Sequence, residues 1–315
     1  MNRFRASRPR PKRHSLFVLP VLAVILALVT ACGGGTDAGG GDASAPTLRI
    51  SSIPDQDQDK LAARDGAMAA YLGEKLGVKA EYVPVTDYSS SVTLFRSGDL
   101  DLVFYGGLTG VQARLQTPGS TLIAQRDIDD DFRSVFIAST ASGIQPFTEV
   151  SGLSALRGKR VTFGSESSTS GRLMPEYFLD QAGVSKADFA GEVGFSGSHD
   201  ATINLVQAGT YEAGALNVQV WQNRTKEGKV DPTKVREVFT TPTYHDYHWI
   251  AGPEVDQRFG AGFSGRIRTA MLELKADDPR GRELLEKYGA ASFVATAPEN
   301  YAQIEQIARQ LGLLG

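Results

Sequence analysis

The chain has 315 residues, a formal net charge of −3 and a hydrophobic content of 41%, which is ordinary for a globular protein of one large or two modest domains. Its acidic balance lacks the basic face that nucleic-acid binding requires, so we expect no nucleic-acid partner. A single cysteine leaves no disulfide, and stability must therefore come from a hydrophobic core.

The first 31 residues have the pattern of a secretory signal peptide. A basic stretch precedes an apolar run from Leu16 to Val29, which is shorter than the about 20 residues that a membrane span needs. The run ends in Leu-Val-Thr-Ala-Cys at residues 28–32 and resembles the lipobox of bacterial lipoproteins, in which the cysteine becomes the lipidated first residue. We therefore expect a membrane anchor at Cys32 on the extracytoplasmic face of the cell membrane. Residues 32–46 are rich in small and polar residues and are expected to form a flexible tether.

From residue 47 onward, strand and helix patterns alternate. The periodicity predicts strands over 47–51, 78–82 and 100–104, each followed by a helix, over 61–76, 87–98 and 108–115. This order predicts a parallel sheet covered on both faces. The pattern then restarts, with strands over 134–139, 160–163, 212–216, 237–240 and 249–251, another before Ser196, a short helix or turn over 153–158, helices over 173–182 and 201–208, and a helical tail from 263.

We interpret this pattern as two α/β lobes, with the second inserted into the first. The first lobe is expected to comprise residues 47–136 and 250–315, and the second lobe residues 137–249.

Ligands of open parallel sheets bind outside the carboxyl ends of the strands, and these positions are rich here in hydroxyls, glycines and tyrosines. The run Ser165–Gly171 precedes a helix, so its hydroxyls and backbone N–H groups can hold an anion without a cation, although a solvated capping loop would have the same composition. His199 can donate to an oxyanion or can simply begin a helix. Tyr88 and Tyr105 follow two strands, where each can bind ligand or pack.

Longer segments resemble a known family. They are SSIPDQ near Ser51, VTDY at Tyr88, YGGLTGVQAR from Tyr105, QRDIDDDFRSVFIA from Gln125, LRGKRVTFGSESSTSGRLMP from Leu156 and SGSHDATINLVQAGTYEAGALN from Ser196. The chain is similar to the periplasmic phosphonate- and phosphite-binding proteins of ABC importers, and within them to a subgroup named for selenate binding.

The resemblance implies a type II periplasmic-binding-protein fold, in which two α/β lobes joined by a two-stranded hinge close on the ligand. Carried over to this chain, the anion contacts fall on Tyr88, Tyr105, Ser167, Ser168, Thr169, Ser170 and His199, and which of the serines touch the ligand stays open. Phosphonate binders have an acid where this chain has Asn217, whose amide can donate to oxygen and so favours a compact oxyanion. Tyr244 begins a polar, aromatic segment near the return crossing, where it can line the cleft or the hinge.

The resemblance also implies a monomeric receptor without cofactor or catalytic activity. It would pass a phosphonate, phosphite, phosphate or selenate-like oxyanion to a membrane permease driven by a separate ATPase. Two alternatives remain at this point. One is a metal receptor that uses His199, His245 and His248. The other is a secreted hydrolase, although the sequence contains no Gly-x-Ser-x-Gly or HExxH motif.

Overall fold

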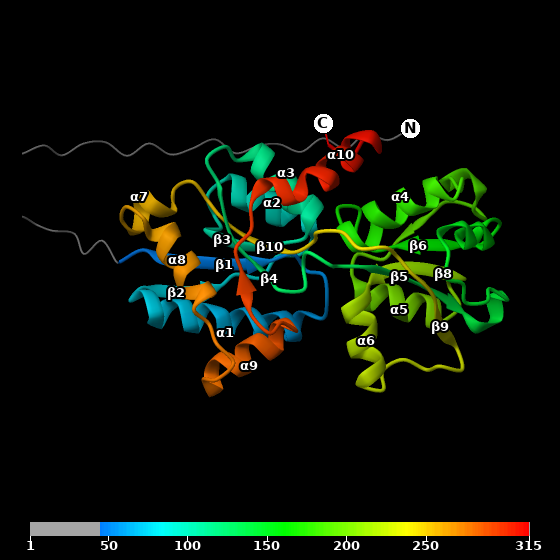
Figure 1. The fold of residues 1–315 in the computed structure, drawn as a ribbon, viewed down its shortest axis with the longest axis horizontal. Coiled ribbons are helices and arrows are strands. Elements are labelled where there is room, and N and C mark those ends of the chain that lie inside the picture. Colours follow the sequence, from blue (N-terminus) through cyan, green and yellow to red (C-terminus); the bar gives the residue numbers. More distant parts are fainter. Residues whose placement is uncertain (1–44, 315) are drawn as a thin grey trace, which may run out of the picture. The chain divides into compact units, whose positions relative to one another are not determined.

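The structure is a computed structural model that describes residues 45–314. The expected signal peptide, the anchor at Cys32 and nearly all of the tether lie outside the described residues. In the described part, two β-sheets are each covered by helices on both faces (Figure 1). No helix in this part is both long and apolar enough to cross a membrane.

The first sheet has the strand order β11-β4-β10-β3-β1-β2. Its strands are β1 (Thr47–Ser52), β2 (Lys79–Tyr82), β3 (Leu102–Tyr105), β4 (Thr121–Arg126), β10 (His248–Ala251) and β11 (Phe293–Val294). Its helices are α1 (Gln58–Leu76), α2 (Tyr88–Arg96), α3 (Gly107–Gln116), α7 (Val255–Phe259), α8 (Phe263–Leu272), α9 (Pro279–Tyr288) and α10 (Ala302–Gln310).

The first three strands are parallel, as predicted, but the sheet as a whole is mixed. Strand β1 pairs in parallel with β2 and β3, but β10 is antiparallel to both β3 and β4, and β11 is antiparallel to β4. The physical reason is that β10 carries the chain back from the second lobe and enters the sheet between β3 and β4 in the opposite direction.

The second sheet has the order β7-β6-β8-β5-β9, in which β5 is antiparallel to β8 and β9 while β6 is parallel to β7 and β8. Its strands are β5 (Ser134–Ser139), β6 (Val161–Phe163), β7 (Gly194–Phe195), β8 (Ala213–Asn217) and β9 (Val235–Thr240), and its helices are α4 (Met174–Gln181), α5 (His199–Gln207) and α6 (Val218–Lys226). A π-helical turn over Thr169–Leu173 leads into α4, and short 3₁₀ turns cover Thr140–Ser142, Val150–Leu156, Lys186–Asp188 and, in the first lobe, Pro298–Tyr301.

Side-chain caps start the helices that border the junction of the lobes. The Asp57 carboxylate accepts from the amides of Asp59 and Lys60 at the start of α1, and Asp87 accepts from the Ser90 amide at the start of α2. Helix α1 ends, as its sequence predicts, at Gly77, which has a φ of 70°.

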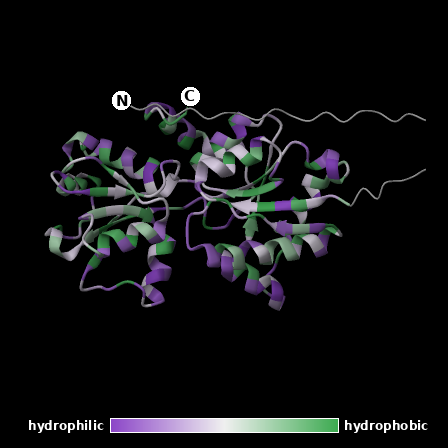
Figure 2. Ribbon diagram, turned by 180° about the vertical axis from the view of Figure 1, so that it is seen from behind, coloured by the Kyte–Doolittle hydropathy of each residue, from purple (hydrophilic) through white to green (hydrophobic). Residues whose placement is uncertain are grey.

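Apolar side chains fill the space between each sheet and its helices, and hydrophobic segments recur in the strands and helices of both lobes (Figure 2). The larger core cluster spans the first lobe and one face of the second sheet, and a smaller cluster around Val135, Ile203 and Leu216 covers the other face. Each fully buried Leu, Ile or Phe contributes about 1.5–3 kcal/mol to folding.

Two connectors, residues 127–133 and 241–247, join the lobes. They run antiparallel and are bridged by Phe132 and Tyr244, whose backbone amides and carbonyls exchange two hydrogen bonds of 3.0 Å. The expected lobe boundaries fall inside β5 and β10, whereas the structure keeps all of β5 in the second sheet and all of β10 in the first.

Candidate functional site

Three hydrogen bonds join the lobes where the predicted site residues lie. The Leu108 amide donates to Thr169 Oγ1 (2.9 Å), the His199 amide donates to the Asp55 carbonyl (2.9 Å), and the Asp57 amide donates to an Asp200 carboxylate oxygen (2.8 Å). Thr169 and His199, from two separate segments of the second lobe, are therefore held against the first lobe.

The serine-rich run forms the π-helical turn, and only its later residues are buried. Ser168, Thr169 and Ser170 are each 1–2% exposed, whereas Ser167 is half-buried. Ser168 Oγ accepts from the Gly171 amide at 2.9 Å, and a Cβ atom at Gly171 would lie only 2.8 Å from that oxygen. Such π-turns concentrate at functional sites because they re-aim backbone and side-chain groups.

A chain of hydrogen bonds runs through the Tyr247 hydroxyl. This hydroxyl donates to Asp55 Oδ2 (2.8 Å), accepts from Asn217 Nδ2 (3.2 Å) and lies 3.4 Å from His199 Nε2. His199 Nδ1 accepts from the backbone N–H of Asn217 (3.4 Å), which assigns the ring proton to Nε2. Burial lowers the pKa of His199 to about 4, so the ring is a neutral donor at physiological pH.

A second group surrounds Asp246. The Gly107 amide donates to Asp246 Oδ1 at 2.8 Å. Burial raises the pKa of Asp246 to about 7, and Asp129 adds to this rise, while the Gly107 amide, the Thr169 hydroxyl and Arg126 act in the opposite direction. Asp246 is therefore an acid that changes its charge near neutral pH.

Four buried polar atoms in this region have no hydrogen-bond partner among residues 45–314. They are Asp55 Oδ1, the Tyr88 hydroxyl, Ser170 Oγ and Asp246 Oδ2. Burial raises the pKa of Tyr88 well above its ordinary value, the carboxyls of Asp55 and Asp246 add to the rise, and the nearby Ser168 hydroxyl opposes it. Burial likewise raises the pKa of Asp55. Two hydroxyls and two carboxyls therefore offer free hydrogen-bonding capacity in one place, which fits a small polar ligand with both acceptor and donor atoms.

Tyr244 supports this region from the connector. Its hydroxyl lies 2.6 Å from Ser134 Oγ, and Ser134 Oγ donates to the Ser170 carbonyl at 2.8 Å. We call the following set the interlobe cluster: Asp55, Tyr88, Ser168, Thr169, Ser170, His199, Asn217, Tyr244, Asp246 and Tyr247.

Tyr105 does not join the interlobe cluster, contrary to its expected role. Its hydroxyl donates to the Ser91 carbonyl at 2.9 Å, and its ring packs edge-on against Phe95. The side chain is therefore committed to the core of the first lobe.

The residues predicted from sequence did not include four that form or support the interlobe cluster: Asp55, Ser134, Asp246 and Tyr247. Asp55 follows the first strand and Asp246 and Tyr247 follow Tyr244, so their positions at strand ends and at the return crossing were signals that could have found them. Ser134 begins a strand, and no sequence pattern distinguishes it.

The three histidines of the metal-receptor alternative do not form one site, although His245 and His248 both pack against Tyr301. His199 contacts Asn217 and Tyr247, whereas His248 stacks on Tyr301, with ring centroids 3.9 Å apart, and faces the Asp246 carbonyl at 3.2 Å. Within residues 45–314, no group of three or more His, Cys, Asp or Glu side chains is arranged to hold a metal ion. The donor set therefore does not support a metal receptor.

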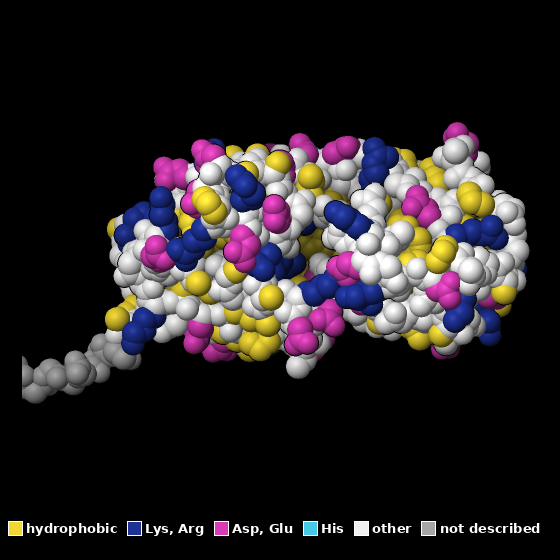
Figure 3. Space-filling view, turned by 90° about the horizontal axis from the view of Figure 1, so that it is seen from below, with side chains coloured by type: hydrophobic (Ala, Val, Ile, Leu, Met, Phe, Trp, Pro, Cys, Tyr) yellow, Lys and Arg dark blue, Asp and Glu magenta, His cyan; other side chains and the backbone are white. Residues whose placement is uncertain are grey.

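A polar cavity connects the interlobe cluster with the surface. A pocket of about 50 Å³ touches Asp55, Asn217 and Tyr247 and shares Gln56, Arg64, Asn223 and Lys287 with a wider cavity of about 550 Å³, which we call the vestibule. Further cations of the vestibule are Lys60 and Lys226. Its face of the molecule is hollowed between the lobes and bordered by both basic and acidic side chains (Figure 3). The lining of the vestibule likewise includes Glu227 and Glu286 beside its four cations.

Comparisons with known proteins identify the family to which this chain belongs. A family profile described as ABC transporter, phosphonate, periplasmic substrate-binding protein matches residues 50–301. The chain is 46% identical over 265 residues, 84% of this chain and 89% of its relative, to the probable ABC transporter phosphite-binding protein PhnD1 of Prochlorococcus marinus strain MIT 9301. It is 26% identical over 268 residues, 80% of this chain and 82% of the other, to the phosphate-import protein PhnD of Mycolicibacterium smegmatis.

Solved structures give the same result. The structure of PhnD1 from Prochlorococcus marinus in complex with methylphosphonate superposes with a TM-score of 0.83 over 84% of this chain and 98% of that chain, at 46% identity. A binding-protein component of an ABC phosphonate transporter from Pseudomonas aeruginosa, at 15% identity, shares the fold, with a TM-score of 0.73 over 84% of this chain and 86% of that chain. The expected type II periplasmic-binding fold is thus confirmed. The chain belongs to the family of periplasmic substrate-binding proteins of phosphonate ABC transporters.

Proposed function

We propose that this substrate-binding protein of an ABC importer takes a small phosphorus oxyanion that carries a proton, such as phosphite, hydrogen phosphate or methylphosphonate. The ligand would sit in the interlobe cluster and be delivered to the permease of the transporter. The protein is a transport component and not an enzyme, so binding and closure of the lobes are its whole mechanism.

The observation that carries the proposal is the set of unpartnered buried atoms. The Tyr88 hydroxyl and Ser170 Oγ can donate to anionic oxygens, and the His199 ring supplies a neutral N–H nearby. Asp55 Oδ1 and Asp246 Oδ2 are acceptors when ionised, so each needs a donor or a proton of its own. A ligand with both anionic oxygens and an O–H group satisfies both kinds of atom.

The relatives support a phosphorus oxyanion. One is named as phosphite-binding and was crystallised with methylphosphonate, and another is named for phosphate import. Selenate and sulfate carry no proton at neutral pH. Either would bring two negative charges toward the carboxyls of Asp55 and Asp246 without offering them a donor. Each carboxyl would then have to take up a proton from solvent, which costs binding free energy at a pH above its pKa.

Calorimetric titration of the protein without its signal peptide tests this proposal. Phosphite, methylphosphonate and phosphate should bind, and sulfate and selenate should bind more weakly, because neither brings the proton that the carboxyls of Asp55 and Asp246 would otherwise have to take up from solvent. A variant with Asn223→Ala, in the vestibule but outside the interlobe cluster, should retain the same order. Equal affinity for selenate and phosphite would refute the proposal, and so would an organic solute that binds when none of these oxyanions does.

We further propose that the protein is anchored to the membrane through lipidated Cys32. The sequence of residues 28–32 and the small, polar tether that follows support this. In cells, a Cys32→Ser variant should lose incorporation of labelled fatty acid and move to the soluble envelope fraction. Unchanged membrane association of that variant would contradict the anchor.

A further inference from the structure

We propose that Gln219 is a closure latch, a residue that prolongs the stay of the ligand by holding the two lobes together. Gln219 lies in the first turn of α6, two residues after Asn217 of the interlobe cluster. The inference needs only that a ligand closes the lobes, and it does not depend on which oxyanion that ligand is.

The first-lobe half of the latch is Arg126 at the end of β4. Its guanidinium donates from Nε and Nη2 to the Asp129 carboxylate, at 2.9 and 2.5 Å, and from Nη1 to the Tyr288 carbonyl at 2.9 Å. It also lies over the Tyr247 ring, 4.9 Å from the centroid, and is 5% exposed. Because these partners belong to the first lobe and its connectors, the guanidinium is held in place independently of the second lobe.

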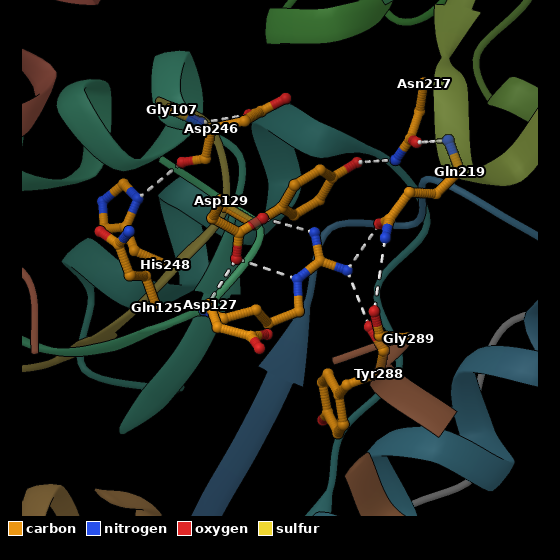
Figure 4. Close-up of polar contacts among 12 residues, drawn as sticks. Gly107, Gln125, Asp127, Asp129, Asn217, Gln219, Asp246, His248, Tyr288 and Gly289 are labelled. Carbon is orange, nitrogen blue, oxygen red and sulfur yellow. Dashed lines mark hydrogen bonds and ion pairs between the residues drawn. The ribbon is translucent and has the colours of Figure 1, made fainter. Parts of the chain in front are cut away.

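The second-lobe half is the Gln219 side chain. Its Oε1 accepts from Arg126 Nη1 at 3.0 Å, and its Nε2 donates to the Gly289 carbonyl, just after α9, at 3.5 Å (Figure 4). Among residues 45–314, the hydrogen bonds of this side chain go only to first-lobe groups. The Gln219 side chain therefore forms no hydrogen bond within the second lobe and acts only when the lobes meet.

The geometry favours reversible closure. Arg126 Nη1 is shared between Gln219 and the Tyr288 carbonyl, so opening the lobes leaves that nitrogen with a partner. A hydrogen bond to a charged group is stronger than a neutral one, and this bond is partly buried. Removing the hydrogen bond between Arg126 and Gln219 should therefore destabilise the closed form and leave the stability of the open form unchanged.

The latch is also tied to the site through the start of α6. The Asn217 side-chain oxygen accepts from the backbone N–H of Gln219 at 2.7 Å, and its side-chain nitrogen donates to the Tyr247 hydroxyl. By contrast, the ion pair between Lys60 and Glu227, which also crosses between the lobes, has both side chains about one-third exposed. Such pairs contribute little because water screens them. Gln219 is accordingly a stronger interlobe contact than the pair of Lys60 and Glu227.

Stopped-flow kinetics with phosphite or methylphosphonate test the latch. Gln219→Ala should speed dissociation about tenfold, while the association rate constant and the melting temperature of the free protein stay close to wild type. Gln222→Ala, which alters an exposed residue of the same helix, is the matched control and should behave as wild type. Gln219→Glu keeps an oxygen that can accept from Arg126 and should dissociate no faster than wild type.

The latch would be overturned by an unchanged dissociation rate in Gln219→Ala, by a fall in the melting temperature of the free variant, or by a Gln219→Glu variant as fast as Gln219→Ala. If wild-type protein bound neither probe, the proposed function would fail first. The same variants would then be compared with whichever solute does bind.

Discussion

Replacing Asp246 by asparagine should remove one proton from the binding reaction at alkaline pH. In the wild type, Asp246 Oδ1 accepts from the Gly107 amide and Oδ2 has no partner within the described residues. The Asp246→Asn side chain can keep the first bond and present an N–H where Oδ2 now lies. The variant therefore supplies a donor that never titrates.

The magnitude follows from the pKa of Asp246, which burial raises to about 7. Once the pH exceeds this value and the ligand has lost its own proton, the complex must take up one proton that Asp246 and the ligand share. Each further pH unit then weakens the binding free energy by about 1.4 kcal/mol, which is a tenfold loss of affinity. In the Asp246→Asn variant, this loss of affinity with rising pH should vanish or become clearly smaller.

Calorimetric titration of phosphite at about pH 8.5, in buffers of different ionisation enthalpy, counts the protons taken up. The wild type should take up about one proton more than Asp246→Asn. Asp127→Asn serves as the control, because Asp127 accepts from the Ala291 amide and lies outside the interlobe cluster. The same proton count in wild type and Asp246→Asn would refute the reasoning.

The free protein offers a second readout. The pKa of Asp246 is raised on folding, so its contribution to stability is full at low pH and is lost as the pH rises through about 7. The melting temperature of the wild type should therefore fall between about pH 4 and pH 7 more steeply than that of Asp246→Asn, and the difference should stop growing above about pH 7.

Three further substitutions test other parts of the site. Tyr88→Phe removes a hydroxyl without a partner among the described residues, so calorimetry should show affinity for phosphite reduced about tenfold or more while the free protein melts as before. Gly171→Ala places a Cβ 2.8 Å from Ser168 Oγ and 3.2 Å from the His199 ring, so thermal unfolding should show a loss of about 1–3 kcal/mol. Asn217→Asp removes the donor to Tyr247 and adds a negative charge, so competition binding should show weaker methylphosphonate binding and a relative gain for aminoalkyl phosphonates.

Local sequence patterns predicted the features that depend on local physics. Glycine at position 77 ends α1 in the left-handed conformation that favours it, and the serine-rich run before Pro175 does lead into a helix. The alternation of apolar residues also located β1, β2 and β3. In each case the deciding interaction lies within a few residues along the chain.

Other features depend on distant parts of the chain, and the sequence did not reveal them. Strand β4 was missed because its residues from Leu122 to Arg126 are all buried, so it lacks the alternation of a half-exposed strand. The direction of β10 was missed because strand direction leaves no local signature. Asp55 and Asp246 resemble ordinary surface acids until the fold buries them.

The placement of β10 in the middle of the first sheet sets the order in which the chain can fold. The first sheet needs β10 between β3 and β4, so it cannot be completed until the residues after 247 are available. The second sheet is built from one continuous stretch, Ser134–Thr240, and can form earlier. A chain that stops before His248 should therefore yield a folded second lobe beside an incomplete first one.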